Sequence, residues 1–362
     1  MNFDKLLNLV IQKNATDLFL RTGAPPRVRL NGLVKAVHAD AVSAEEIDAV
    51  AQRIAGPEAL QTLKQTGEAD IAFDYEQKAR FRAALFHTRG RLSVALRYLP
   101  LDIPSLEELN LPADTLRPLA ENEHGLVLVT GVAGSGKSTC LASMIEHINR
   151  NFYRHIVTIE DPIEYVFQDR NSFISQREVG TDTGDFHAGL RHCVRQSPDV
   201  ILIGEMRDRQ TMEAALNAAE TGHLVFSTLH TLNAIQTVER ILSYFPVHQH
   251  TLVRLQLSMV LQGIVSLRLL RKADGSGLIP AVEIMLATPR IRELLEKGET
   301  KSLPEAVRQG HVLGCRTFNN SLAELLRADV ISREDALASS PHPTELRLEL
   351  EGLSGASSIA LG

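Results

Sequence analysis

The strongest constraint on the fold is a glycine-rich stretch in the middle of the 362-residue chain. It reads Gly131-Val132-Ala133-Gly134-Ser135-Gly136-Lys137-Ser138, a complete GxxxxGKS pattern. An apolar run precedes it and a plausible helix follows it, as this phosphate-binding loop requires. Glycines let the backbone wrap closely around a phosphate, and the N–H groups at the helix start bind its oxygens. The stretch therefore predicts a nucleotide-binding domain.

The positions of this loop have different expected roles. Lys137 is expected to bridge the β- and γ-phosphates of ATP, and Ser138 to hold Mg²⁺. The predicted nucleotide-binding residues are Gly131, Val132, Ala133, Gly134, Ser135, Gly136, Lys137, Ser138 and Thr139.

Four apolar runs in the second part of the chain are each followed by residues that can bind a ligand or take part in catalysis. They span residues 126–129, 156–159, 200–203 and 224–226. Amphipathic helical patterns alternate with these runs, which is typical of a parallel sheet covered on both faces. In such sheets the ligand binds beyond the carboxyl ends of the strands. We therefore expect the four strand ends to converge on one site.

Two of these ends carry candidate catalytic carboxylates. The second run leads into Glu160-Asp161-Pro162-Ile163-Glu164, where one acid could be a general base, and Glu205 follows the third run. Gly204 occupies the place that many such enzymes fill with aspartate. Glu205 is therefore expected to act on Mg²⁺ through water or to polarise the attacking water, with Glu164 sharing that work.

Histidines and arginines give weaker signals. His223 and His230 flank the fourth run with no zinc-pair spacing, and His230 is expected near the γ-phosphate. Arginines crowd two predicted strands of the N-terminal region, where they form either a solvated face or the cation that stabilises transition-state charge. These arginines are Arg80, Arg82, Arg89, Arg91 and Arg97.

Length and pattern predict two domains, because 362 residues exceed the usual size of a single core. Residues 1–100 read as an α+β domain, with a hairpin turn at Asn31-Gly32 and strands at 81–86 and 92–98 about Thr88-Arg89-Gly90. Residues 101–112 read as a linker, 113–288 as the ATPase core, and 289–362 as a helical region whose end frays near 354–358.

Composition excludes several classes. A net charge of −6 without a basic run argues against nucleic-acid binding. Cys140, Cys193 and Cys315 are too scattered for a zinc knuckle or a disulfide framework and fit reduced cytosolic thiols. No leader or apolar run of about 20 residues is evident, so we expect only peripheral membrane contact.

Together these segments resemble the secretion ATPases, specifically the type IV pilus retraction ATPases of the PilT and PilU group. The resemblance rests on Lys13-Asn14-Ala15-Thr16-Asp17-Leu18, on the glycine-rich loop, on Thr158-Ile159-Glu160-Asp161-Pro162-Ile163-Glu164, on Asp199-Val200-Ile201-Leu202-Ile203-Gly204-Glu205, and on the stretch from Thr221-Gly222-His223 to His230. It implies a PAS-like N-terminal domain, a RecA-like P-loop ATPase domain with a helical C-terminal tail, and a ring of six subunits. By the same resemblance Glu164 and Glu205 match catalytic glutamates, while Arg82 and Arg97 reach the nucleotide of a neighbour.

Two departures point to the accessory, PilU-like members of the group. Where retraction motors carry an AIRNLIREGK-like helix, this chain has Pro289-Arg290-Ile291-Arg292-Glu293-Leu294-Leu295-Glu296-Lys297-Gly298, and its tail from Thr317 onward also resembles PilU. The resemblance then implies a cytoplasmic protein that powers retraction and twitching motility. Its expected partners are a PilT-type ATPase and an inner-membrane pilus platform protein.

Three rival readings remain at this point. A pilus-assembly or type II secretion ATPase typically carries a tetracysteine metal motif, which three scattered cysteines cannot form. A nucleotide-binding regulatory subunit is disfavoured by intact Lys137, Ser138, Glu164 and Glu205. A RecA-like DNA motor is disfavoured by the acidic balance.

Overall fold

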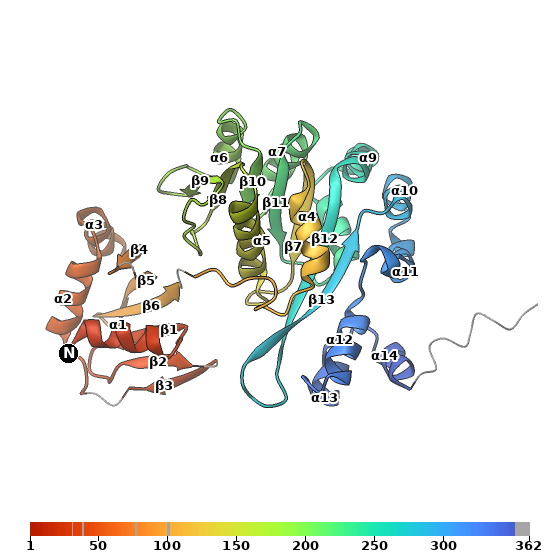
Figure 1. Ribbon diagram of the computed structural model, residues 1–362. Coiled ribbons are helices and arrows are strands. Elements are labelled where there is room, and N and C mark those ends of the chain that lie inside the picture. The colour runs from red at the N-terminus through yellow and green to blue at the C-terminus, as the bar shows by residue number, and fades with distance from the viewer. Residues whose placement is uncertain (31, 38–39, 77, 100–101, 352–362) are drawn as a thin grey trace, which may run out of the picture. The chain divides into compact units, whose positions relative to one another are not determined.

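The structure is a computed structural model that describes residues 1–362 except 31, 38–39, 77, 100–101 and 352–362 (Figure 1). The chain divides into two compact units, Met1–Asp102 and Ile103–Gly362. Asn31, the ends of the predicted linker near residue 100 and the expected frayed end lie partly or wholly outside the described residues. Among the described residues, no helix is both long enough and apolar enough to cross a bilayer.

The N-terminal unit is built on one antiparallel sheet of six strands, in the order β3-β2-β1-β6-β5-β4. Three helices supply apolar side chains to its core. The elements are α1 (Phe3–Gln12), β1 (Asp17–Arg21), β2 (Arg27–Leu30), β3 (Leu33–Ala36), α2 (Ala44–Ile54), α3 (Pro57–Thr66), β4 (Glu68–Tyr75), β5 (Ala79–Thr88) and β6 (Arg91–Leu99).

Local sequence explains these elements. Ser43 and Glu46 form a reciprocal capping box that starts α2. Along β5, buried residues alternate with more exposed ones, so one face of the sheet joins the core and the other stays open. Arg89 and Gly90 both have positive φ, as a two-residue turn between β5 and β6 requires. The predicted strands at 81–86 and 92–98 are confirmed, and β2 and β3 pair as the expected hairpin.

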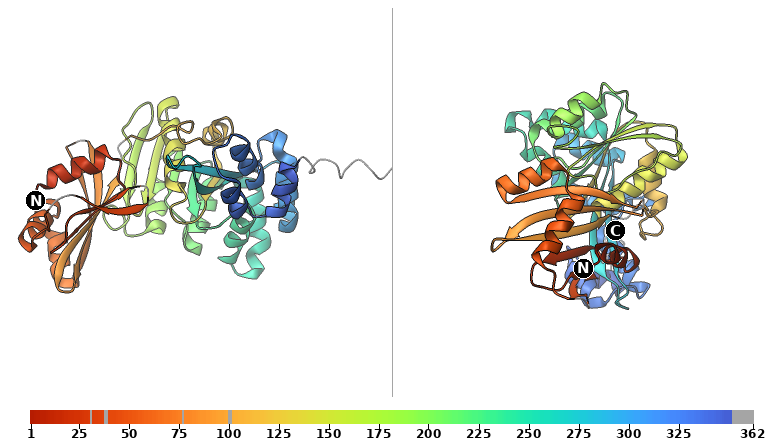
Figure 2. Two further views of the ribbon diagram at one scale, coloured as in Figure 1. Left: turned by 90° about the horizontal axis from the view of Figure 1, so that it is seen from below. Right: turned by 90° about the vertical axis from the view of Figure 1, so that its left-hand side faces the viewer.

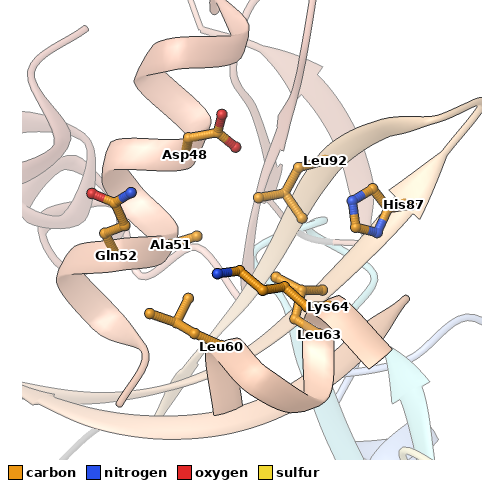
Figure 3. Close-up of a pocket in the computed structure, with 8 residues that line it drawn as sticks. All are labelled: Asp48, Ala51, Gln52, Leu60, Leu63, Lys64, His87 and Leu92. Carbon is orange, nitrogen blue, oxygen red and sulfur yellow. The ribbon is translucent and has the colours of Figure 1, made fainter. Parts of the chain in front are cut away.

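A shallow pocket of about 290 Å³ lies in the N-terminal unit between α2, α3 and the β5–β6 strands (Figure 3). Leu60, Leu63 and Leu92 supply its apolar lining, while Asp48 and Lys64 stand at its polar side (Figure 3). None of the predicted site residues lines this pocket.

The C-terminal unit is built on a seven-stranded sheet in the order β13-β12-β7-β11-β10-β8-β9. All its neighbouring strands are parallel except β12 and β13, which pair antiparallel. The strands are β7 (Gly125–Thr130), β8 (His155–Glu160), β9 (Phe173–Glu178), β10 (Val200–Ile203), β11 (Leu224–Leu229), β12 (Leu261–Arg271) and β13 (Leu278–Leu286).

Helices cover both faces of this sheet, which produces two separate cores. On β7, Leu126 and Leu128 pack with one group of helices, while Val127 and Val129 pack with the other. The first group includes α6 (Phe186–Cys193), α7 (Arg209–Glu220), α8 (Ala234–Ser243) and α9 (His250–Val260), together with the helices of residues 289–297 and 303–309. The second group is α4 (Ala113–Glu121) and α5 (Lys137–Asn151). A strand buried on both faces reads as a continuous apolar run, which is why the four predicted strands are confirmed.

Sequence patterns did not predict β9, β12 and β13. β9 carries Ser175, Gln176 and Arg177 at the sheet edge, so its pattern is largely polar. β12 and β13 form a long hairpin that extends toward the C-terminal helices (Figures 1 and 2). Those helices confirm the helical pattern beyond Pro289, and they are α10 (Pro289–Lys297), α11 (Leu303–Gln309), α12 (Phe318–Arg327), α13 (Arg333–Ser339) and α14 (Pro343–Leu350).

Candidate functional site

The glycine-rich loop joins β7 to α5, as its sequence context requires. Gly131, Gly134 and Gly136 all have positive φ. A Cβ at Gly131 would lie 2.3 Å from the Ser135 hydroxyl and 2.6 Å from the Leu267 carbonyl oxygen, so only glycine fits there. Gly136 then stands at the start of α5, whose first-turn N–H groups face the loop.

Lys137 lies inside this loop and is only 8% exposed. Its Nζ donates to the carbonyl oxygens of Gly131 and Val132, each at 2.9 Å. Burial lowers the pKa of Lys137, while the negative charges of Glu164 and Glu205 act in the opposite direction. The structure therefore places both predicted carboxylates within electrostatic reach of the loop lysine.

Glu205 follows β10 and contacts two side chains, Arg207 and His230. Its Oε1 pairs with Arg207, and its Oε2 lies 3.5 Å from Nε2 of His230. Only 13% of the Glu205 side chain is exposed, against 55% for His230 and 65% for Arg207. These three side chains, together with Arg240, line a cavity of about 390 Å³.

Gly204 lies beside a buried acid of the neighbouring strand. A Cβ at Gly204 would lie 3.4 Å from the Cα of Glu160, which ends β8. Glu160 Oε1 accepts from Thr158 Oγ1 at 2.7 Å and from Gln176 Nε2 at 3.2 Å. Burial raises the pKa of Glu160 to about 7 against these two hydrogen bonds. Beside Gly204, the buried carboxylate is therefore supplied by β8.

Glu164 differs from Glu160 because it is exposed in the loop after β8. The next residue, Tyr165, shares a hydrogen bond of 2.9 Å with Thr139 Oγ1 in the first turn of α5. Gln176 also donates to the Tyr165 carbonyl at 2.8 Å. These contacts fix the segment that carries Glu164 against the helix that follows the glycine-rich loop.

The two histidines lie at opposite ends of β11. His223 precedes the strand, and its Nδ1 bonds to the Ala218 carbonyl at 3.0 Å, which is a structural contact. His230 follows the strand beside Glu205. In the described part of the chain, no three His, Cys, Asp or Glu side chains form a metal-binding group, and the free thiols of Cys140, Cys193 and Cys315 are buried.

The predicted arginines belong to the N-terminal unit, whereas Lys137, Glu164, Glu205 and His230 gather in the C-terminal unit. Arg82 on β5 lies directly opposite Arg97 on β6, so both point to the same face. The same row continues to Asp17 and Arg29. Asp17 is largely buried and accepts from Nε of Arg29 at 2.9 Å and from Nε of Arg97 at 3.3 Å, while 64% of the Arg97 side chain is exposed.

Comparison with known proteins decides the family. Residues 2–319 match the family described as Type II/IV secretion system protein. The chain belongs to this family. It is 39% identical to the type IV pilus ATPase PilU of Pseudomonas aeruginosa over 97% of this chain and 92% of that protein. It is 34% identical to type II secretion system protein E of Xanthomonas campestris over 75% of this chain but 48% of that protein.

The fold of this chain is similar to that of a solved structure along nearly the whole length of the chain. The crystal structure of the pilus retraction motor PilT with bound ADP superposes with a TM-score of 0.88, at 42% identity, covering 96% of this chain and 99% of that one. The mixed α/β fold with its parallel sheet is therefore a fold on which a nucleotide has been observed.

Three residues at the site, Arg207, Arg240 and Glu160, were not singled out from sequence. Arg207 was missed because nothing in its sequence position distinguishes it from other surface arginines, although it lies only two residues beyond Glu205. Glu160 was one of three neighbouring acids, and its burial depends on Thr158, Gln176 and the neighbouring strand. Only the tertiary structure separates it from Asp161 and Glu164.

Proposed function

We propose that this protein is an ATP-hydrolysing motor that powers type IV pilus retraction and twitching motility, most similar to the accessory, PilU-type ATPases. The observation that carries the proposal is the near full-length match to PilU and PilT in a chain whose glycine-rich loop, Glu164 and Glu205 gather at one end of a parallel sheet. The much shorter share of protein E that is covered favours retraction over type II secretion.

The residues of the loop fit a nucleotide triphosphate and Mg²⁺. Backbone N–H groups at the start of α5 bind phosphate oxygens, and the buried ammonium of Lys137 supplies a positive charge. Ser138, in the first turn of α5, and Glu205 offer the hard oxygen donors that Mg²⁺ prefers, Glu205 through water. When bound, Mg²⁺ neutralises charge on the phosphates.

The chain's own side chains then divide the work of hydrolysis. Lys137 orients and neutralises the β- and γ-phosphates. Glu205 and Glu164 polarise the attacking water, and His230 responds to loss of the γ-phosphate through its position beside Glu205. Arg207 and His230 each contact one oxygen of Glu205, and each oxygen keeps a second lone pair that can accept a hydrogen bond from water.

The N-terminal unit is proposed to be a PAS-like domain and the C-terminal unit a RecA-like ATPase domain, joined by the linker 101–112 and followed by the helical region 289–362. We assign Arg82 and Arg97 to the nucleotide of a neighbouring subunit in a homo-hexamer. Arg97 pairs with Asp17 but remains largely exposed, and this supports the assignment, since its guanidinium is accessible on the open sheet face.

The working partners are a PilT-type retraction ATPase and the inner-membrane pilus platform protein. We place the protein in the cytoplasm, associated peripherally with the inner membrane through the pilus machine, and assign it no nucleic-acid partner. Its helix α10, which has Pro289 and Arg290 where retraction motors carry a different sequence, supports the accessory role.

Three measurements test this proposal. The purified protein should hydrolyse ATP in steady state, whereas filter binding with single- and double-stranded DNA should detect no complex. Deleting the gene alone and together with a PilT-type paralogue should lengthen or multiply surface pili and reduce twitching. Normal pilus length and motility in both strains would contradict a role in retraction.

A further inference from the structure

Glu283 is a partly buried carboxylate that none of the predicted catalytic roles uses. It lies on β13, and its Oε1 accepts a hydrogen bond of 2.8 Å from the backbone N–H of Ala234, the first residue of α8. The two residues are 49 positions apart, so this contact is tertiary rather than a local cap. Asn233 separately caps the same helix by accepting from the N–H of Gln236 at 2.8 Å.

Burying this carboxylate opposes folding, since a charge in an apolar core loses its hydration. Burial raises the pKa of Glu283 to about 7, while the hydrogen bond from Ala234 and the charge of Arg268 on β12 act in the opposite direction. The neighbours of Glu283 along β13, Val282 and Ile284, are buried, while Ser266 lies opposite it on β12. The partly buried Glu283 therefore has a specific partner at the positive end of α8, the backbone N–H of Ala234.

The segment that Glu283 anchors leads directly to the site. Residues 230–233 connect β11 to α8, and His230 lies in this connection, 3.5 Å from Glu205. On the other side, Glu283 lies opposite Ser266 across the β12–β13 pair. The buried Ser266 hydroxyl accepts from Thr130 Oγ1 at 2.9 Å, and Thr130 is the last residue before the glycine-rich loop.

We propose that Glu283 is a positioning residue that holds the start of α8, and through it His230, at a fixed place relative to Glu205 and the glycine-rich loop. The inference rests on the proposed ATP hydrolysis for its kinetic consequence, but not for its structural one. Glu283 itself touches neither nucleotide nor reacting water. Its loss should therefore reduce the rate of the chemical step more than it reduces nucleotide binding.

The test uses two substitutions of similar size. Glu283→Met removes the acceptor and leaves an apolar side chain suited to this core, whereas Glu283→Gln retains an amide oxygen that accepts from Ala234. Glu296→Gln, at an exposed glutamate on α10, is the matched control. For each full-length protein, kcat, KM for ATP and backbone amide exchange across residues 229–243 are measured, with thermal unfolding alongside.

Glu283→Met should lower kcat about tenfold with KM changed less than twofold, and should speed amide exchange in the first turn of α8. Glu283→Gln should keep most of the wild-type kcat and most of the slow amide exchange in the first turn of α8. Glu296→Gln should match the wild type in both measurements. Normal kcat and exchange in Glu283→Met would overturn the inference. So would equal failure of the Gln variant, or exchange accelerated uniformly across the C-terminal unit.

Failure of the proposed function has a different signature. A wild-type protein that does not hydrolyse ATP would overturn the ATPase proposal, while amide exchange in the three variants would still decide whether Glu283 holds the start of α8.

Discussion

The two sheets of this protein use their polar residues in different ways. In the C-terminal unit the strands β7, β8, β10 and β11 are parallel and buried on both faces, and the residues of the candidate site lie where these strands end: at Gly131, Glu160, Glu205 and His230. In the N-terminal unit the sheet is antiparallel with one open face, so charged residues such as Arg97 occur within the strands, opposite one another.

This difference between the two sheets determines how well the function of a residue can be predicted from its position in the sequence. A reactive side chain at the end of a buried parallel strand is seldom needed for the fold itself. The ends of neighbouring parallel strands also lie at the same edge of the sheet, so the sequence indicates which such residues come together. On an open antiparallel face, an arginine is equally compatible with solvation, with an ion pair to Asp17 and with action on another subunit. We therefore expect substitutions in the parallel sheet to have large effects within one chain, and arginine substitutions to depend on assembly.

The largest effect is expected at Lys137. Replacing it with alanine removes the buried positive charge of the glycine-rich loop, so ATP turnover should fall about a thousandfold or more. Circular dichroism and thermal unfolding should remain close to the wild type, because loop glycines rather than Lys137 define the backbone path. Unchanged turnover in a folded Lys137→Ala protein would remove the loop from the catalytic site.

Glu205→Gln should have a smaller effect of a different kind. The amide keeps the shape of the carboxylate but loses its charge, its basicity and one of its two acceptor oxygens, so turnover should fall about a hundredfold while ATP binding persists. Turnover and equilibrium binding of a fluorescent nucleotide separate the two outcomes. Loss of nucleotide binding together with turnover would indicate that Glu205 chiefly holds Arg207 and His230 in place.

Mixed assemblies test the proposed action of Arg97 on a neighbour. Arg97→Ala and Lys137→Ala proteins should each be inactive, yet equal mixing should leave roughly one interface in four with an intact lysine facing an intact arginine. ATPase activity should then reappear in the mixture. Arg29→Ala, which alters the other ion pair of Asp17, is the control and should retain activity alone. No recovery in rings shown to contain both proteins would place Arg97 in its own subunit's chemistry or outside catalysis.

The smallest expected effect concerns the pH dependence of stability. Glu160 has a pKa raised from 4.5 to about 7 by burial, so the folded protein binds its proton more tightly than the unfolded chain. Its stabilising contribution is complete below pH 4.5 and is lost as pH rises through 7. Glu160→Gln should therefore reduce the fall in unfolding free energy between these pH values by about 3 kcal/mol, measured by urea unfolding. An identical pH profile in both proteins would contradict a buried, proton-binding Glu160.

Sequence reasoning succeeded where a residue type is required by local geometry. Gly131 cannot be replaced without a clash, so the glycine-rich motif can be recognised in the sequence. Strand β7 can be predicted because both its faces are buried and its residues are therefore apolar. It was incomplete where a role depends on contacts between distant segments. The burial of Glu160 requires Gln176 from β9, and the partner of Glu283 lies 49 residues away at the start of α8. Neither relation has a periodic or motif signal.

Pilus retraction in a defined strain tests the central claim most directly. The strain carries a PilT-type motor that is catalytically dead but still assembled, and retraction of labelled pili is followed by microscopy. If this protein drives retraction from its own ATPase site and needs the partner only for assembly, retraction should continue in this strain. It should stop when Lys137→Ala is introduced into this protein, and it should also be lost when the partner is deleted. Retraction that is equally vigorous with Lys137→Ala would contradict the claim that hydrolysis at this glycine-rich loop drives the pilus.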